Sequence, residues 1–90
     1  MDLSVIVVSY NTCQLLDDCL ASLFAADPPA GGVEVIVVDN ASGDGSVAMV
    51  RNKHPQAIVL ACEDNLGFSA ANNRGSAIAG GDYLLFLNSD

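Results

Sequence analysis

Polar side chains suited to nucleotide binding follow each of four apolar runs in this 90-residue chain. They form the segments Ser9-Tyr10-Asn11, Asp39-Asn40-Ala41-Ser42, Glu63 to Gly67 and Asn88-Ser89-Asp90. In a parallel α/β sheet the carboxyl ends of the strands meet at one edge, and ligands bind beyond that edge. Carboxylates, amides and hydroxyls gathered there provide the acceptors and donors that ribose hydroxyls and a base edge need. The sequence therefore predicts a polar ligand site at this edge of the sheet, which we call the carboxyl edge.

Two of the apolar runs, Leu3–Ser9 and Val33–Asp39, are rich in β-branched residues and are typical of strands buried on both faces. Between them, apolar residues from Leu15 to Phe24 recur on one helical stripe, which Asn11 or Thr12 is placed to cap and which 27–32 ends. A second helix is predicted over Ser46–Lys53, capped by Ser42 or Asp44, and a strand follows over Ala57–Cys62.

A third helix is predicted from about Ser69 to Gly80-Gly81, and a strand over Tyr83–Leu87 follows it. The residues predicted on one face of this helix are Phe68, Ala71, Gly75 and Ile78.

The resulting order β-α-β-α-β-α-β predicts a Rossmann-like α/β fold with four mainly parallel strands and helices on both faces. A buried parallel strand needs cover on its faces, yet no helix follows the last apolar strand. We therefore expect residues 1–90 to be an incomplete domain. We also expect the uncovered strand, from Leu84 to Leu87, to promote self-association through the sheet edge.

The balance of charge restricts the class of partner. Three Lys and Arg residues against eleven Asp and Glu residues give a net charge of −8, so no basic surface is available for a nucleic acid backbone. Cys13, Cys19 and Cys62 lack the spacing of a zinc site or a disulfide framework, and we interpret them as small apolar core residues. Without a signal peptide or a membrane-spanning run in the sequence, we expect the chain in the cytoplasm or at the cytoplasmic face of a membrane.

Three common nucleotide-binding signatures do not fit. The first turn, Ser9 to Cys13, lacks the glycines of a dinucleotide fold, and no phosphate-loop motif is present. Gly43 to Ala48 loosely matches a glycine-rich turn but follows the second strand, and a receiver domain would need paired acids after the first. His54 precedes Pro55 and is interpreted as a helix-end residue rather than a catalytic base. The sequence therefore excludes a dinucleotide-binding dehydrogenase and a phosphate-loop NTPase.

Four ordered segments carry a family resemblance. Leu3–Asn11, Val35–Ser42, Asn65–Gly75 and Tyr83–Asp90 together resemble the N-terminal half of a family 2 glycosyltransferase with the GT-A fold, nearest to the rhamnosyltransferase-like group. The resemblance implies that residues 1–90 are the donor-binding part of a single domain. The implied reaction is inverting transfer of a sugar from a nucleotide-diphosphate sugar to a saccharide or lipid-linked acceptor. It also implies that the general base lies beyond residue 90, so no catalytic residue is assigned within this chain.

The resemblance also assigns binding residues. Ser9, Tyr10 and Asn11 would line the nucleotide pocket, and Asp39 would accept hydrogen bonds from the base or ribose, which its place at a strand end independently favours. Asn72 and Arg74 would lie near the nucleotide. A guanidinium can pair with a diphosphate, although a surface arginine paired with a neighbouring acid is an equal alternative.

The last three residues occupy the place of the family's D-x-D metal motif. Asp90 would bind a divalent cation, Mn²⁺ or Mg²⁺, whose charge stabilises the leaving nucleotide. Asn88 stands where the family has an acid, so its part in the metal site is open, and we count it among the residues that contact the donor. This departure leaves a second hypothesis, a nucleotide-binding or interaction module with a degenerate, non-catalytic site.

Overall fold

The computed structural model describes residues 2–26 and 32–89, and within them the seven predicted elements occur in the predicted order. The strands are β1 (Leu3–Ser9), β2 (Val33–Asp39), β3 (Ile58–Ala61) and β4 (Tyr83–Asn88), and the helices are α1 (Cys13–Ala25), α2 (Ser46–Lys53) and α3 (Phe68–Ile78). The predicted stop of the first helix falls mostly on residues 27–31, outside the described residues. β3 is one residue shorter than expected at each end, and at its start the amide of Ala57 donates instead to the carbonyl of His54 in the turn after α2.

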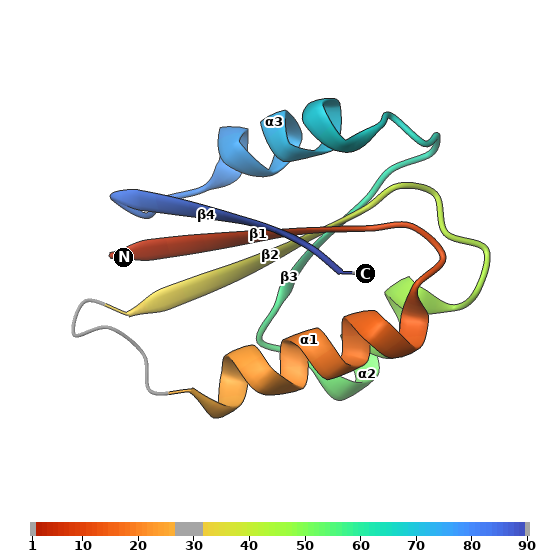
Figure 1. Cartoon of the computed structure of the whole chain (residues 1–90), viewed down its shortest axis with the longest axis horizontal. Helices are drawn as coiled ribbons and strands as arrows, with labels where there is room; N and C mark the ends of the chain where they lie inside the picture. Colours follow the sequence, from red (N-terminus) through yellow and green to blue (C-terminus); the bar gives the residue numbers. More distant parts are fainter. Residues whose placement is uncertain (1, 27–31, 90) are drawn as a thin grey trace.

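The strands form one parallel sheet in the order β3-β2-β1-β4. α1 and α2 cover one face of this sheet and α3 covers the other (Figure 1). This arrangement confirms the predicted Rossmann-like fold with helices on both faces. It also places β1 at the centre, paired with β2 on one side and with β4 on the other.

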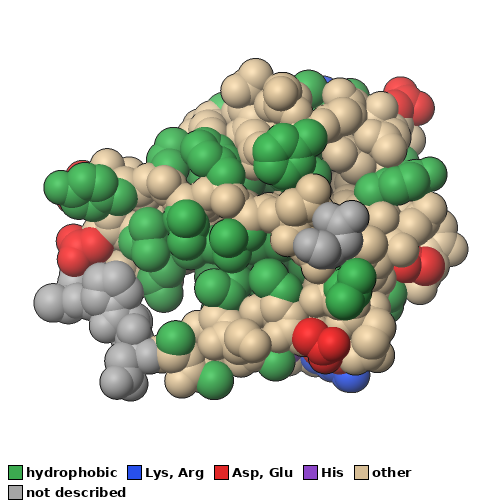
Figure 2. Space-filling model, in the orientation of Figure 1, with side chains coloured by type: hydrophobic (Ala, Val, Ile, Leu, Met, Phe, Trp, Pro, Cys, Tyr) green, Lys and Arg blue, Asp and Glu red, His purple; other side chains and the backbone are tan. Residues whose placement is uncertain are grey.

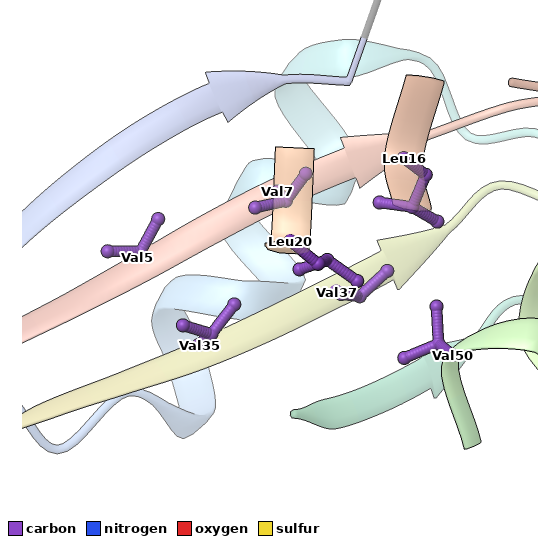
Figure 3. Packing of buried hydrophobic residues seen from close by; sticks show 7 residues of the cluster. All are labelled: Val5, Val7, Leu16, Leu20, Val35, Val37 and Val50. Atoms are coloured by element: carbon purple, nitrogen blue, oxygen red, sulfur yellow. The ribbon is translucent and has the colours of Figure 1, made fainter. Parts of the chain in front are cut away.

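Alternate residues of β1 and β2 point to opposite faces and build two apolar clusters. The cluster under α1 and α2 contains Val5, Val7, Leu16, Leu20, Val35, Val37 and Val50 (Figure 3). The cluster under α3 contains Ile6, Val8, Ile36, Val38 and Ala71. Each fully buried aliphatic side chain contributes about 1.5–3 kcal/mol by leaving water. The two central strands are thus fixed from both faces, as their apolar runs predicted.

The prediction for the buried face of α3 is half right. Ala71 and Gly75 are buried, whereas Phe68 and Ile78 are 48% and 47% exposed. The latter two are the first and last residues of the helix, and the small residues between them form its close contact with the sheet. A Cβ on Gly75 would lie 2.6 Å from Cγ2 of Ile6, which confirms that this glycine is a close-packing position.

The outer strand β4 is exposed over most of its length, and only Leu87 is half-buried. Tyr83 is 74% exposed, and Leu84, Leu85 and Phe86 are each 43% exposed. Figure 2 shows apolar side chains gathered on the face of the molecule that β4 crosses. This finding agrees with the expectation that the last strand is uncovered in this chain.

His54 is the residue at the end of α2, as predicted, and it is buried. Its Nε2 atom lies 2.7 Å from Oδ1 of Asp17 in α1, and its ring stacks on Phe24. Hydrogen bonds from His54 and Lys53 lower the pKa of Asp17. The histidine therefore ties α2 to α1.

The cysteines are free thiols, each half-buried. Cys19 packs against the cluster under α1 and α2, and Cys62 packs against the cluster under α3. Burial raises the pKa of the Cys19 thiol. The core role predicted for the cysteines holds for these two.

Candidate nucleotide-binding site

The strands β1, β2 and β4 end at nearly the same position along the sheet, at the carboxyl edge. In the ladder, Ser9 pairs with Asp39, and Val8 pairs with Asn88. The pairing continues past the strands, where the amide of Asn40 donates to the carbonyl of Ser9 at 2.8 Å and the amide of Ser89 donates to the carbonyl of Val8 at 3.2 Å. The structure therefore brings the predicted residues Ser9, Asp39 and Asn88 to one edge.

Asp39 holds a buried carboxylate at this edge, with the residue only 2% exposed. Its Oδ2 atom accepts a hydrogen bond of 2.8 Å from the amide of Ser42. Its Oδ1 atom is shielded from solvent and has no partner within the described part of the chain. A buried polar atom without a partner is costly and rare, so Asp39 presents an unsatisfied acceptor where the fold places ligands.

The loops after β1 and β2 are joined by reciprocal hydrogen bonds. The amide of Asn11 donates to Oγ of Ser42 at 2.8 Å, and the amide of Gly43 donates back to Oδ1 of Asn11 at 2.8 Å. Asn11 and Ala41 both have positive φ angles, 51° and 64°. Asparagine tolerates this conformation better than most residues, whereas alanine adopts it at a cost. The two loops therefore form one unit around Asp39.

The predicted helix caps are confirmed in part, because Thr12 and Asp44 lie at the helix starts but their hydrogen bonds differ from those of ordinary caps. Thr12 is the N-cap residue of α1 but its side chain makes no capping bond, and the amide of Cys13 donates instead to Oδ2 of Asp44 at 3.0 Å. For α2 the N-cap residue is Gly45, while Asp44 accepts from the amide of Ser46 at 3.2 Å. Hydrogen bonds from the Ser46 hydroxyl and from the Cys13 and Ser46 amides lower the pKa of Asp44. A single carboxylate thus serves both helix N-termini.

A chain of hydroxyls links the first strand to the end of the fourth. Oγ of Ser9 lies 3.1 Å from Oγ1 of Thr12, which is hydrogen-bonded in turn to Oγ of Ser89. Ser9 and Ser89 are buried, so the Ser9 hydroxyl is already engaged within the protein. Tyr10, which was also predicted to line the pocket, is 49% exposed, so its ring is accessible to a ligand.

The N-terminus of α3 is fixed to the end of β2 by Asn40. Its Oδ1 atom accepts from the amide of Leu66 at 3.3 Å, and its Nδ2 atom donates to the carbonyl of Gly67 at 3.4 Å. Gly67 has a φ of 82°, which confirms its prediction as a turn residue with unusual dihedrals.

Asn72 and Arg74 do not share a face of α3. At about 100° per residue, they lie about 200° apart around the helix. Oδ1 of Asn72 is buried without a partner among the described residues, whereas Arg74 is exposed. The structure therefore gives the two residues different surroundings.

The predicted metal ligand Asp90 lies outside the described residues. Among residues 2–26 and 32–89, no group of three or more His, Cys, Asp or Glu side chains is placed to hold a metal ion. No helix in those ranges is long and apolar enough to cross a membrane.

Sequence reasoning named Thr12 and Ser42 as candidate helix caps and placed Ser42 and Ser89 in the polar segments, but it did not predict the contacts through which these residues organise the edge. Their short polar side chains next to strand ends were the available signal, because serine and threonine there often bond to nearby backbone. The partners themselves come from other loops and could not be read from local sequence.

Comparison with known proteins decides the family. Residues 4–90 match the model of Glycosyl transferase family 2. The chain belongs to this family. Membership confirms the resemblance seen in the four sequence segments, and the confirmation extends to the family and fold but not to the rhamnosyltransferase-like group.

Two curated relatives of this family 2 glycosyltransferase chain match it over nearly all of its length. It is 33% identical over 94 residues to poly(ribitol-phosphate) beta-glucosyltransferase of Bacillus spizizenii, covering 100% of this chain and 15% of the relative. It is 32% identical over 90 residues to glycosyltransferase AglE of Haloferax volcanii, covering 97% of this chain and 30% of the relative. The chain therefore spans less than a third of either relative.

Solved structures match the whole fold of this family 2 chain. The structure of S. aureus TarS in complex with UDP-GlcNAc superposes with a TM-score of 0.89 at 33% identity, covering 100% of this chain and 27% of TarS. The mannosyltransferase PcManGT of Pyrobaculum calidifontis, in complex with GDP-Man and Mn²⁺, gives a TM-score of 0.85 at 30% identity, covering 98% of this chain and 27% of that one.

Proposed function

We propose that this chain binds the nucleotide of a nucleotide-diphosphate sugar in an enzyme that transfers the sugar, with inversion, to a saccharide or lipid-linked acceptor. The observation that carries the proposal is the unsatisfied Oδ1 atom of buried Asp39 at the carboxyl edge. Family membership supports it, as do the structural neighbours solved with UDP-GlcNAc and with GDP-Man. Residues 1–90 would form the donor-binding part of a single glycosyltransferase domain.

Asp39 would accept a hydrogen bond from an N–H of the base or from a ribose hydroxyl. Because solvent does not reach Oδ1, neighbouring side chains must move when the donor group approaches. Tyr10 has an exposed ring that can lie against the base or sugar. Asn11 would line the pocket where its amide joins the loop after β1 to Ser42 in the loop after β2. Ser9 would shape the pocket through Thr12, to which its hydroxyl is bonded.

The diphosphate needs positive charge in a chain of net charge −8. Arg74 is exposed on α3 and would pair with phosphate oxygens. Asn72 would contact the ligand from the opposite side of the same helix. Lys53, by contrast, is paired with Asp17 at 2.9 Å. Arg74 alone would therefore leave most of the diphosphate charge uncompensated.

A divalent cation, Mn²⁺ or Mg²⁺, would supply the remaining charge. The carboxylate of Asp90 would bind the ion as a hard oxygen donor that suits either metal, and Asn88, the last residue of β4, would contact the sugar donor. The absence of a three-ligand cluster in the described part fits an ion that takes its other ligands from the diphosphate and water. Bound there, the ion would neutralise charge on the leaving nucleotide.

The remaining steps lie with other residues. We assign no general base within residues 1–90, and we expect it in the part of the relatives that this chain does not span. A cytoplasmic location, or one at the cytoplasmic membrane face, agrees with free thiols in a reducing compartment and is tested by cell fractionation.

Calorimetric titration tests the proposal. The full chain as it is made in the cell is titrated with uridine, thymidine and guanosine diphosphates, with and without Mn²⁺. We expect one to bind, more tightly with the metal, and Asp39→Asn to weaken it at least about tenfold by removing the acceptor. Asp82→Asn, which changes an exposed acid just before β4 at the opposite edge of the sheet, is the matched control and should bind as the parent does. A folded full chain that binds none of the three contradicts the proposal.

A non-catalytic binding module is the alternative, favoured by the asparagine at position 88. Such a module would bind the nucleotide equally well without metal. Titration of Asp90→Ala separates the two: loss of the Mn²⁺ effect supports the transferase, and an unchanged, metal-independent affinity supports the module.

We also propose that the 90-residue chain associates with itself through β4. The exposed apolar side chains along this edge strand support the proposal, since an open strand edge pairs readily with another.

A further inference from the structure

The contacts at the carboxyl edge assign a role to Ser42 that the family resemblance did not suggest. We infer that Ser42 is a positioning residue, which holds Asp39 in place for the nucleoside through a bridge from Asn11 to Ser42 to Asp39. The inference rests on the proposed function, because it concerns the placement of the carboxylate that would bind the nucleoside.

The bridge has two hydrogen bonds that meet at one residue. The hydroxyl of Ser42 accepts from the backbone amide of Asn11 at 2.8 Å, which ties Ser42 to the end of β1. The backbone amide of Ser42 donates to Oδ2 of Asp39 at 2.8 Å, which fixes the rotation of the carboxylate at the end of β2. The other oxygen, Oδ1, is buried and has no partner among the described residues.

The loop backbone explains why the bridge is needed. Ala41 lies between the bridged residues with a φ of 64°, a conformation that a non-glycine residue leaves easily unless neighbouring contacts hold it. The return bond from the Gly43 amide to Asn11 holds the other side of Ser42. A loosened Ser42 would let the turn relax and the Asp39 carboxylate rotate, which costs affinity for the nucleoside.

The test compares three variants of the full chain at one position. Ser42→Ala and Ser42→Cys remove the strong oxygen acceptor, and Ser42→Thr keeps it. Each variant is titrated with the nucleoside diphosphate that the parent protein binds and with inorganic pyrophosphate, both with Mn²⁺. Circular dichroism verifies that each variant is folded.

We expect Ser42→Ala and Ser42→Cys to bind the nucleoside diphosphate about three- to tenfold more weakly, the usual effect of one hydrogen bond, with pyrophosphate affinity unchanged. Ser42→Thr should bind both as the parent does. Equal weakening for both ligands would indicate general loosening of the site and overturn the inference, as would failure of threonine to restore binding.

The result also separates this inference from the proposed function. If Asp39→Asn loses nucleotide binding while Ser42→Ala and Ser42→Cys keep it, the proposed function stands and the bridge has no part in it. If the parent protein binds none of the nucleoside diphosphates, both proposals fail.

Discussion

Gly81 lies where the connection into β4 passes the start of β1, and we expect Gly81→Ala to destabilise the fold. A Cβ atom there would lie 2.6 Å from both the backbone nitrogen and the Oγ atom of Ser4, and 2.8 Å from the carbonyl carbon of Leu3. β1 is held between β2 and β4, so the connection must move instead. That movement breaks two bonds: the Gly81 amide donates to Oγ of Ser4 at 2.8 Å, and the Gly80 amide donates to Oε2 of Glu34 at 2.6 Å.

The magnitude follows from these contacts. Overpacking costs about 1–3 kcal/mol, and two hydrogen bonds add about 2 kcal/mol. Replacing glycine restricts the unfolded chain and returns about 1 kcal/mol. The free energy of unfolding should therefore fall by about 2–4 kcal/mol, a large part of the total of about 5–15 kcal/mol typical of a domain.

Urea unfolding followed by circular dichroism measures this change. Gly43→Ala is the matched control, because a Cβ at Gly43 meets nothing within 4 Å and the residue has no positive φ. The control should stay within about 0.5 kcal/mol of the parent. A Gly81→Ala protein that is equally close to the parent would refute the reasoning from the Cβ contacts.

Three further predictions concern other parts of the chain. Gly75→Ala should lower the free energy of unfolding by about 1 kcal/mol, because the clash with Ile6 outweighs the gain in helix propensity; a more stable variant in urea would contradict this. Hydrogen bonds from Ser4 and Gly80 lower the pKa of Glu34 in the folded protein. The ionised carboxylate therefore contributes fully to the free energy of unfolding above the pKa that Glu34 has in the unfolded chain, and this contribution is lost as pH falls through the lower pKa of the folded protein. Urea unfolding between pH 7 and about pH 3 should therefore show a weaker acid effect in Glu34→Gln, and an unchanged pH profile would count against it. Leu85→Glu should convert the self-associated chain to a monomer in light scattering, whereas a parent chain that is already monomeric would disprove association through β4.

The fold could be predicted from the sequence where local and global signals agree. Leu3–Ser9 and Val33–Asp39 have the predicted bounds, because continuous β-branched runs suit only the buried centre of a parallel sheet. Ser46–Lys53 also has the predicted bounds, since Pro55 prevents its continuation. The exposure of Phe68 and Ile78 escaped prediction because periodicity describes a helix face and not the length of helix that the sheet covers.

The candidate site was predictable only in part. Parallel topology levels the strand ends, so the meeting of Ser9, Asp39 and Asn88 followed from the order of elements. The contacts that hold the loops join Asn11 to Ser42 and Cys13 to Asp44, in each case 31 positions apart. No local pattern encodes such pairs, because they depend on how two separate turns approach each other in the folded protein.

The central place of β1 also has a consequence for the order of folding. Leu3 pairs with Val33 on one side but with Tyr83 on the other, a separation of 80 positions. Contacts between distant positions form slowly, because a long loop must close before they stabilise the chain. During synthesis β1 leaves the ribosome before β2, and of the four strands β4 follows last. The edge that joins Thr12 to Ser89 therefore forms only after β4 has joined the sheet, and any ligand that requires this edge selects chains in which β4 is in place.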